Sequence, residues 1–209
     1  MAPLTDDRPK PLIEVAGKSL LHHALDPARE AGLSPIVVNA HYLADQLATA
    51  LRGQPDILSR EEPEILDTGG GLKAALPKLP GKAVFTMNSD AVWTGSNPFV
   101  TLRDAWSPAE MDALVLCVPM ARAEGRADRG DFTIDDTARV TRGPGHVYTG
   151  AQIIRSDLVA RHPERVFSFN ILWDEMIARG RLFAAIHPGK WCDVGRPTSI
   201  PLAEAMIDV

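Results

Sequence analysis

The chain is poor in cysteine and has no excess of basic residues. Its 209 residues include two cysteines, Cys117 and Cys192, too few for a disulfide framework, so we expect a reducing, cytoplasmic setting. Lysine and arginine together number 22 against 27 aspartates and glutamates, a formal net charge of −5. Nucleic-acid binders need a basic excess to neutralise phosphates, so this balance argues against a nucleic-acid partner.

Long apolar runs are absent as well. No stretch of the sequence approaches the ~20 apolar residues that span a bilayer, and the first eight residues lack the basic-then-apolar pattern of a signal peptide. We therefore expect no membrane partner. No internal repeat, low-complexity tract or linker divides the chain, and a chain of this length buries roughly 70% of its unfolded surface as one domain.

Short apolar runs alternate with amphipathic stretches. A helix is predicted to start at Ser19 and stop at Gly32, and others cover 43–51, 171–177 and 197–206. Continuous apolar strands between helices predict an α/β fold whose mostly parallel sheet is covered on both faces. The loop-rich stretch 121–145 predicts a smaller β-rich lobe. The predicted strands are 36–38, 83–87, 113–118, 132–134, 147–154 and 182–186.

Lys10 is the first residue with a chemical signature. It lies between Pro9 and Pro11, which restrict the backbone on both sides and hold the lysine in one place. A positioned ammonium group is a good phosphate ligand. The alternative interpretation is a surface turn with a solvated lysine.

Three consecutive glycines at 69–71 form the second signature. They follow Asp67 and Thr68 and precede an apolar helical pattern, so their backbone N–H groups are predicted to approach a ligand. The stretch lacks the Gly-Lys-Ser/Thr ending of a Walker loop and the Gly-x-Gly-x-x-Gly pattern of dinucleotide-binding proteins. A flexible turn is the alternative.

Two aspartates are candidates for a metal site. Asp90 follows the apolar run 83–87 directly, and the carboxyl end of a buried strand is where open α/β sheets bind ligands. Asp193 lies far along the chain, and the pair suits Mg²⁺, which takes one or two carboxylates plus substrate phosphates. A turn aspartate that caps the next segment is the alternative for Asp90. Cys192 has no partner at metal-ligand spacing, so we expect it to be buried and inert.

Five stretches in this order resemble the sugar-1-phosphate nucleotidyltransferase family, and the resemblance covers essentially the whole chain. It implies an enzyme with a Rossmann-like, three-layer fold and a small β-rich substrate lobe. The implied chemistry is attack of a sugar-1-phosphate oxygen on the α-phosphate of a nucleoside triphosphate, with Mg²⁺ and release of pyrophosphate. The stretches are Pro-Leu-Thr at 3–5, Pro-Lys-Pro-Leu at 9–12, Asp-Thr-Gly-Gly-Gly at 67–71, Asn-Ser-Asp at 88–90 and Trp-Cys-Asp-Val-Gly-Arg-Pro at 191–197.

The resemblance also implies a role for each site residue. Lys10 neutralises the phosphates, while Asp90 and Asp193 hold Mg²⁺, and these three form the catalytic set. Two stretches, 130–132 and 148–150, are similar to family segments near the sugar. The remaining implied contacts are Gly69, Gly70 and Asn88 for the nucleotide, and Asp131 and Gly150 for the sugar.

Substrate choice within the family is a further expectation. The short chain and the Thr-Gly-Gly-Gly patch favour UTP with N-acetylmuramate 1-phosphate, whose carboxylate needs a cation such as Arg122, Arg126 or Arg129. GTP with mannose 1-phosphate is the alternative within the enzyme class. Two further alternatives lie outside the enzyme class. One is a catalytically inactive nucleotide-sugar-binding subunit, and the other is a Rossmann-like binding module with unrelated chemistry. We expect a monomer or a homodimer.

One part of the family pattern does not appear in residues 1–209. The family begins with a strand and a glycine-rich loop before Pro-Leu-Thr, which here occupies 3–5. That first strand belongs at the centre of the sheet, so without it apolar neighbours and backbone groups would lose their partners. We therefore expect a single nucleotidyltransferase domain over 1–209, with a strand and loop encoded upstream of Met1.

Overall fold

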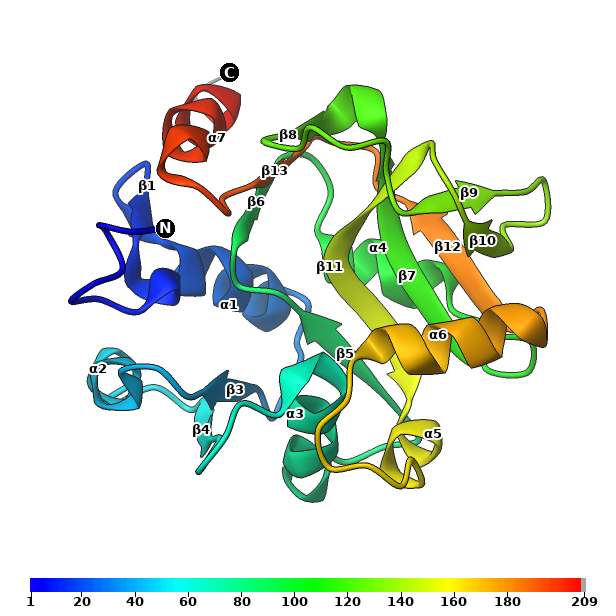
Figure 1. The fold of residues 1–209 in the computed structure, drawn as a ribbon, viewed down its shortest axis with the longest axis horizontal. Helices are drawn as coiled ribbons and strands as arrows, with labels where there is room; N and C mark the ends of the chain where they lie inside the picture. The colour runs from blue at the N-terminus through cyan, green and yellow to red at the C-terminus, as the bar shows by residue number, and fades with distance from the viewer. Residues whose placement is uncertain (208–209) are drawn as a thin grey trace.

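Strand β11 (His146–Arg155) is the centre of the largest sheet in the computed structural model, which describes residues 1–207. Strand β7 pairs along one edge of β11, and β12 pairs with β7. The opposite edge of β11 pairs with β5 at one end and with β9 at the other, and β10 extends β9 (Figure 1). The bounds of these strands are Ala83–Met87 (β5), Ala113–Pro119 (β7), Phe132–Ile134 (β9), Val140–Arg142 (β10) and Leu182–Ile186 (β12).

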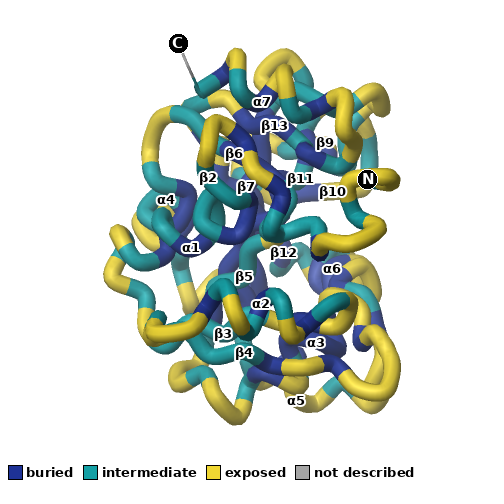
Figure 2. Tube along the Cα trace, turned by 90° about the vertical axis from the view of Figure 1, so that its left-hand side faces the viewer, coloured by how far each residue is buried: buried dark blue, intermediate teal, exposed yellow. Residues whose placement is uncertain are grey.

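Helices cover both faces of this sheet. Side chains alternate along β7, so Val115 packs with α6 (Phe169–Ala178) while Leu114 packs with α4 (Pro98–Ala105). Helix α6 crosses in front of the sheet and α4 lies behind it (Figure 1). In Figure 2 the buried segments follow the central strands, and the exposed segments follow the peripheral loops. The continuous apolar strands therefore reflect burial on two sides, as predicted.

Three smaller sheets flank the central one. Strands β3 (Val37–Ala40) and β4 (Ile57–Arg60) run parallel, joined by α2 (Ala44–Ala50). Strand β13 (Trp191–Asp193) pairs with β6 (Ala91–Trp93) on one side and β8 (Ala123–Glu124) on the other. Strands β1 (Glu14–Val15) and β2 (Lys18–Ser19) form a short hairpin.

The first helix shows how local sequence sets an element. Helix α1 (Leu20–Glu30) begins after Ser19, whose hydroxyl accepts a hydrogen bond from the His22 amide. Gly32, with φ of +74°, stops it. Both ends agree with the prediction. The other helices are α3 (Asp67–Ala75), α5 (Ser156–Ala160), α7 (Ile200–Ile207) and the short 3-10 turns Lys10–Leu12, Leu76–Lys78, Met120–Arg122 and Pro197–Ser199.

The α/β fold class is confirmed, with one difference in detail. The bounds of β5, β9 and β12 match the predicted strands. The central sheet is mixed, because β11 runs antiparallel to β5, β7 and β9, and β12 runs parallel to β7. No helix within 1–207 combines the length and apolar character needed to cross a bilayer.

Helix α6 allows a test of the packing. Met176 has no exposed surface, whereas Ile171 on the same helix is 45% exposed. We expect Met176→Ala to lower the free energy of unfolding by about 2–5 kcal/mol, because it removes buried surface and leaves a cavity. The matched control Ile171→Ala is expected to change it by less than about 1 kcal/mol. Denaturant titration measures both, and equal losses would contradict the placement of α6.

Candidate active site

Lys10 pairs with Asp90 across 80 positions of sequence. The 3-10 turn Lys10–Leu12 begins at Pro9 and contains Pro11, and it directs the Lys10 Nζ to within 2.7 Å of Asp90 Oδ2. The two side chains are 29% and 37% exposed, so the pair remains accessible to a ligand. Lys10 is therefore held at a defined place rather than solvated on a surface turn.

Asp193 lies beside Asp90 because two strands pair there. Asp90 directly precedes β6, Asp193 ends β13, and Asp193 is opposite Ala91 in the antiparallel register. The Val194 amide donates to the Asp90 carbonyl oxygen at 2.8 Å. Burial raises the pKa of Asp193, and the negative charge of Asp90 raises it further, while Lys10, Arg126 and a hydrogen bond from the Gly195 amide oppose the rise. The two carboxylates are thus close enough to repel each other.

This pair fits a divalent cation. A cation between two repelling carboxylates would relieve their repulsion, and Mg²⁺ takes one or two carboxylates and completes its shell with phosphates and water. Within residues 1–207 no third histidine, cysteine or acidic residue joins them in a metal-binding cluster. Asp90 and Asp193 could therefore hold a metal whose other ligands come from the substrate.

Arg126 also lies beside Asp193. Gly125 precedes it with φ of +77°, and a Cβ at Gly125 would overlap the Asp193 carbonyl oxygen, so the chain passes directly against the site. The Arg126 guanidinium contacts Asp128 at 2.5 Å and Asp131 at 3.2 Å. Its buried Nε has no partner in the described part of the chain. In contrast, Arg122 donates to the carbonyl oxygens of His187 and Pro188.

The two predicted sugar residues are placed by strand β11. Asp131 accepts from the Tyr148 amide at 2.9 Å and from Arg126, so its carboxylate holds β11 and the arginine. Gly150 has φ of +87°, and its carbonyl oxygen accepts from the Asn88 amide at 3.0 Å. Gly150 thus brings the predicted nucleotide residue Asn88 next to β11. The sugar-binding roles of Asp131 and Gly150 remain predictions.

The glycine patch lies within a helix, so it is not the flexible turn that was the alternative interpretation. Gly69, Gly70 and Gly71 are buried inside helix α3, and the amides of Gly69 and Gly70 both donate to the Phe167 carbonyl oxygen, at 2.9 and 3.0 Å. A Cβ at Gly69 would overlap the Phe167 ring, and one at Gly70 would overlap a backbone carbonyl oxygen. Close packing against the segment before α6 therefore requires these glycines. Their contact with a nucleotide remains a prediction.

Glu61 is a polar site residue that the sequence pattern did not reveal. It is 9% exposed, and its carboxylate accepts from the Asn39 side chain at 3.0 Å and from the Leu66 amide at 2.9 Å. In the sequence it belongs to a charged run, Arg60-Glu61-Glu62, which is typical of a solvated surface. Its signal in the sequence is its position just after β4, of which Ile57 and Leu58 are apolar.

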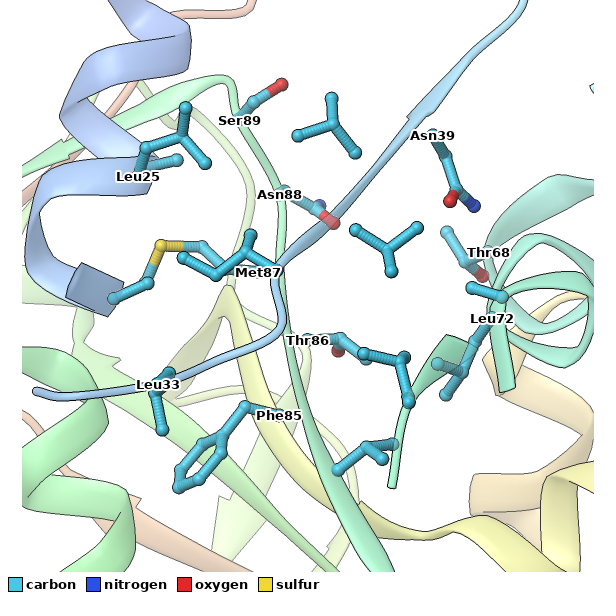
Figure 3. Close-up of a pocket in the computed structure, with 18 of the residues that line it drawn as sticks. Leu25, Leu33, Asn39, Thr68, Leu72, Phe85, Thr86, Met87, Asn88 and Ser89 are labelled. Atoms are coloured by element: carbon cyan, nitrogen blue, oxygen red, sulfur yellow. The ribbon is translucent and has the colours of Figure 1, made fainter. Parts of the chain in front are cut away.

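A cavity of about 780 Å³ lies between β3 and β5 and reaches this site. Its polar end contains Asn39, Thr68, Asn88 and Ser89, and its opposite part is lined by apolar side chains (Figure 3). Lys10 and Asp90 line the cavity, and Lys10 also lines a second cavity of about 510 Å³ beside Met1 and His41. The catalytic candidates therefore lie at the carboxyl ends of β3 and β5, where open α/β sheets bind ligands.

The cysteines take no part in this arrangement. Both are buried and free of disulfide bonds, and burial raises the pKa of Cys192 to about 12 and that of Cys117 as well. Neither thiol is ionised near neutral pH, so neither supplies a reactive thiolate. The prediction that Cys192 is buried is confirmed, and its inertness stays a prediction.

A comparison with family models shows the class of protein to which this fold and site belong. Residues 5–187 match the model of the MobA-like NTP transferase domain. The chain belongs to this family, which confirms the class indicated by the sequence motifs.

Particular relatives refine the comparison. The chain is 34% identical to the N-acetylmuramate alpha-1-phosphate uridylyltransferase of Caulobacter vibrioides, over 99% of this chain and 91% of the relative. The chain is 30% identical to the protein of the same name from Neisseria meningitidis serogroup B, over 99% of this chain and 92% of that protein. The probable mannose-1-phosphate guanylyltransferase 3 of Oryza sativa subsp. japonica is 25% identical, over 94% of this chain and 58% of that protein.

Solved structures agree on the fold. HddC from Yersinia pseudotuberculosis, in complex with GMP-PN, superposes with a TM-score of 0.78 at 19% identity, over 99% of this chain and 93% of that chain. The inositol-1-phosphate CTP transferase from T. maritima superposes with a TM-score of 0.77 at 14% identity, over 98% of this chain and 88% of that chain. At this level of identity the likeness concerns architecture alone.

Gly150 provides a test of the site geometry. Both Gly150 and Gly17 have positive φ, but a Cβ at Gly150 would lie 2.8 Å from Asn88 Cβ, whereas one at Gly17 meets nothing within 4 Å. Gly17→Ala is expected to cost only the backbone strain, about 1–2 kcal/mol. Gly150→Ala is expected to cost more and to reduce nucleotide binding, because Asn88 must move. Thermal unfolding and nucleotide titration measure both effects, and equal behaviour of the two variants would contradict the Gly150–Asn88 contact.

Proposed function

We propose that this protein transfers a uridylyl group from UTP to N-acetylmuramate 1-phosphate, with Mg²⁺, and releases pyrophosphate. The observation that carries the proposal is the convergence of Lys10, Asp90 and Asp193, of which Lys10 and Asp90 line the cavity. Full-length similarity to two uridylyltransferases of that name supports the choice of UTP and of this sugar. The match to an NTP transferase domain supports the reaction class.

The transfer is one displacement at phosphorus. An oxygen of the sugar 1-phosphate attacks the α-phosphorus of UTP, the bond from that phosphorus to the bridging β-oxygen breaks, and pyrophosphate leaves with the bonding electrons. The attacking phosphate is already an anion at neutral pH, so no residue has to remove a proton. Catalysis of such a step consists of positioning and of stabilising the negative charge that spreads over the phosphate oxygens.

Different residues of the site bind the phosphates, the metal and the sugar. Lys10 supplies a positive charge to the phosphates, and its partner Asp90 keeps it in place at 2.7 Å. Mg²⁺, when bound by Asp90 and Asp193, supplies Lewis-acid charge to the oxygens of the reacting phosphates. Arg126 lies beside Asp193 and donates to Asp131, and we infer that its guanidinium binds the sugar's phosphate or its carboxylate.

The two aspartates are tested by removing charge at constant size. Asp90→Asn and Asp193→Asn are expected to lower turnover on the order of 10²-fold or more, because the metal loses a charged ligand. Both variants should also need more Mg²⁺ for half-maximal rate. Asp104→Asn is the control, since that side chain is 69% exposed on α4 and does not line the cavity. Normal Mg²⁺-dependent turnover in Asp193→Asn would remove that residue from the site.

Lys10 is tested by separating activity from stability. Lys10→Ala is expected to reduce turnover strongly, while the thermal midpoint changes little, because a partly exposed ion pair contributes less than about 1 kcal/mol. Lys18→Ala breaks a comparable pair with Asp26, at 2.6 Å and 40% and 34% exposure, and should leave turnover unchanged. A collapse of the midpoint in Lys10→Ala would make Lys10 structural instead.

Substrate identity is tested with a pyrophosphate-release panel. UTP, GTP, CTP and dTTP are each combined with N-acetylmuramate 1-phosphate, N-acetylglucosamine 1-phosphate and mannose 1-phosphate. The proposal predicts the highest kcat/KM for UTP with N-acetylmuramate 1-phosphate. A preference for GTP with mannose 1-phosphate would overturn the substrates, and absence of release with every pair would favour an inactive nucleotide-sugar-binding subunit.

A further inference from the structure

The second cavity differs from the larger one in the charge of its lining. It measures about 510 Å³ and is lined by the end of β3, by α2 and by the turn that carries Lys10. Lys10 and His41 are lining side chains that can carry a positive charge, and none of the described residues that line it is acidic. The lining of the larger cavity, in contrast, includes Glu61, Asp67 and Asp90. In a chain with an excess of acidic residues, the second cavity is the one that suits an anion.

His41 directly follows β3, and one of its ring nitrogens is held by the backbone. Nδ1 lies 2.7 Å from the Glu61 carbonyl oxygen, and a carbonyl oxygen only accepts, so Nδ1 carries a proton. The Glu61 carboxylate accepts from Asn39 and from the Leu66 amide, so it is the backbone of Glu61 that meets the ring. His41 is exposed, and its Nε2 makes no hydrogen bond within residues 1–207. Nε2 is therefore the nitrogen available to a ligand.

The turn that carries His41 is attached to the segment that leads to Lys10. The hydroxyl of Tyr42 donates to the carbonyl oxygens of Thr5 and Asp6, at 3.0 and 2.9 Å. Lys10 follows this segment after a few residues and lines the same cavity. Hydrogen-bonded backbone therefore holds the two cationic side chains on neighbouring segments, as the lining of a binding site requires.

The position of the second cavity relative to the central sheet indicates which phosphate it suits. Strands β9 and β11 lie on one side of β5, whereas β3 and α2 lie on the other (Figure 1). The predicted sugar residues, Asp131 and Gly150, belong to the β9 and β11 side. In nucleotidyl transfer the attacking and leaving oxygens are roughly in line across the phosphorus. With the sugar 1-phosphate on the β11 side and the α-phosphate at Lys10, the leaving group departs towards β3 and the second cavity.

We propose that His41 binds the β- and γ-phosphates of the nucleoside triphosphate, and the pyrophosphate that they become, in the second cavity together with Lys10. This inference rests on the proposed function, and His41 belongs to none of the five stretches of the family resemblance. A phosphate oxygen only accepts, so Nε2 carries a proton in the bound state. With both nitrogens protonated the ring is a cation, and its hydrogen bond to the phosphate is charge-assisted.

Calorimetric titration with inorganic pyrophosphate, UTP and UMP tests this role at a fixed Mg²⁺ concentration. UMP has the base, the ribose and the α-phosphate of UTP but lacks the two outer phosphates. In His41→Asn the side-chain nitrogen replaces Nδ1 as the donor to the Glu61 carbonyl oxygen, while Nε2 is removed. We expect this variant to bind pyrophosphate and UTP about 10-fold or more weakly, because it loses one hydrogen bond to a charged group. Its affinity for UMP should not change.

A rescue variant and a matched control accompany this test. In His41→Gln the side-chain nitrogen reaches the position of Nε2, so part of the affinity for pyrophosphate should return. His23→Gln is the control, because His23 Nε2 lies 3.0 Å from the Val15 carbonyl oxygen and glutamine keeps that donor. His23 lines neither cavity, so His23→Gln should bind all three ligands as the native chain does.

NMR of the histidine rings in the native chain gives a second reading that needs no variant at position 41. Pyrophosphate is expected to convert the His41 ring to its doubly protonated form near neutral pH, because the ligand accepts from Nε2. The ring signals of His23 should stay unchanged. This measurement decides the question if His41→Asn does not fold.

Three results would overturn the role of His41. The first is equal affinity of the native chain and His41→Asn for pyrophosphate, with no change in the His41 ring signals. The second is equal weakening of UTP and UMP, which would place His41 at the base or the α-phosphate. The third is that the native chain does not bind pyrophosphate. Failure of the proposed function would look different, since UMP would then not bind to the native chain while pyrophosphate still reports on His41.

Discussion

The pairing of β11 with three other strands is the constraint on which the rest of the structure depends. β11 holds β7 on one edge and both β5 and β9 on the other. Its register shifts between Tyr148 and Gln152, and Gly150 within that shift accepts the Asn88 amide. This hydrogen bond holds the residue that follows β5, and therefore sets the position of Asp90 beside β13. The geometry of the site thus depends on the register shift in β11.

In the site, the charged side chains are accessible, whereas the backbone that positions them is packed. The charged groups Lys10, Asp90 and Asp193 are partly exposed, and Lys10 pairs with Asp90 and lies near Asp193, so a charged substrate can exchange with these groups at little desolvation cost. The two aspartates are held together by backbone, because the Val194 amide donates to the Asp90 carbonyl oxygen and β13 pairs with β6. A rigid backbone frame around accessible charges is the arrangement that electrostatic stabilisation of a phosphoryl transition state requires.

Local patterns in the sequence predicted most elements of the fold. β5, β9 and β12 are apolar runs bounded by breakers, and such runs have few alternatives to a buried strand. The direction of β11 could not be read, because parallel and antiparallel strands that are buried on both faces have the same composition. The glycines of α3 were misread because helix propensity disfavours them, whereas packing against Phe167 requires them.

The candidate site was predictable in its residues and not in its contacts. Short motifs pointed to Lys10, which follows a breaker, to Asp90, which follows a strand, and to Asp193, which belongs to the Trp-Cys-Asp-Val-Gly-Arg-Pro stretch of the family resemblance. That Arg126 lies near Asp193, and that Glu61 is buried against Asn39, depend on the packing of distant segments. The direct test of the central claim is paramagnetic broadening of NMR signals by trace Mn²⁺, used in place of Mg²⁺ with UTP present. The account predicts loss of the Ala91 and Val194 amide signals, and broadening centred elsewhere would contradict it.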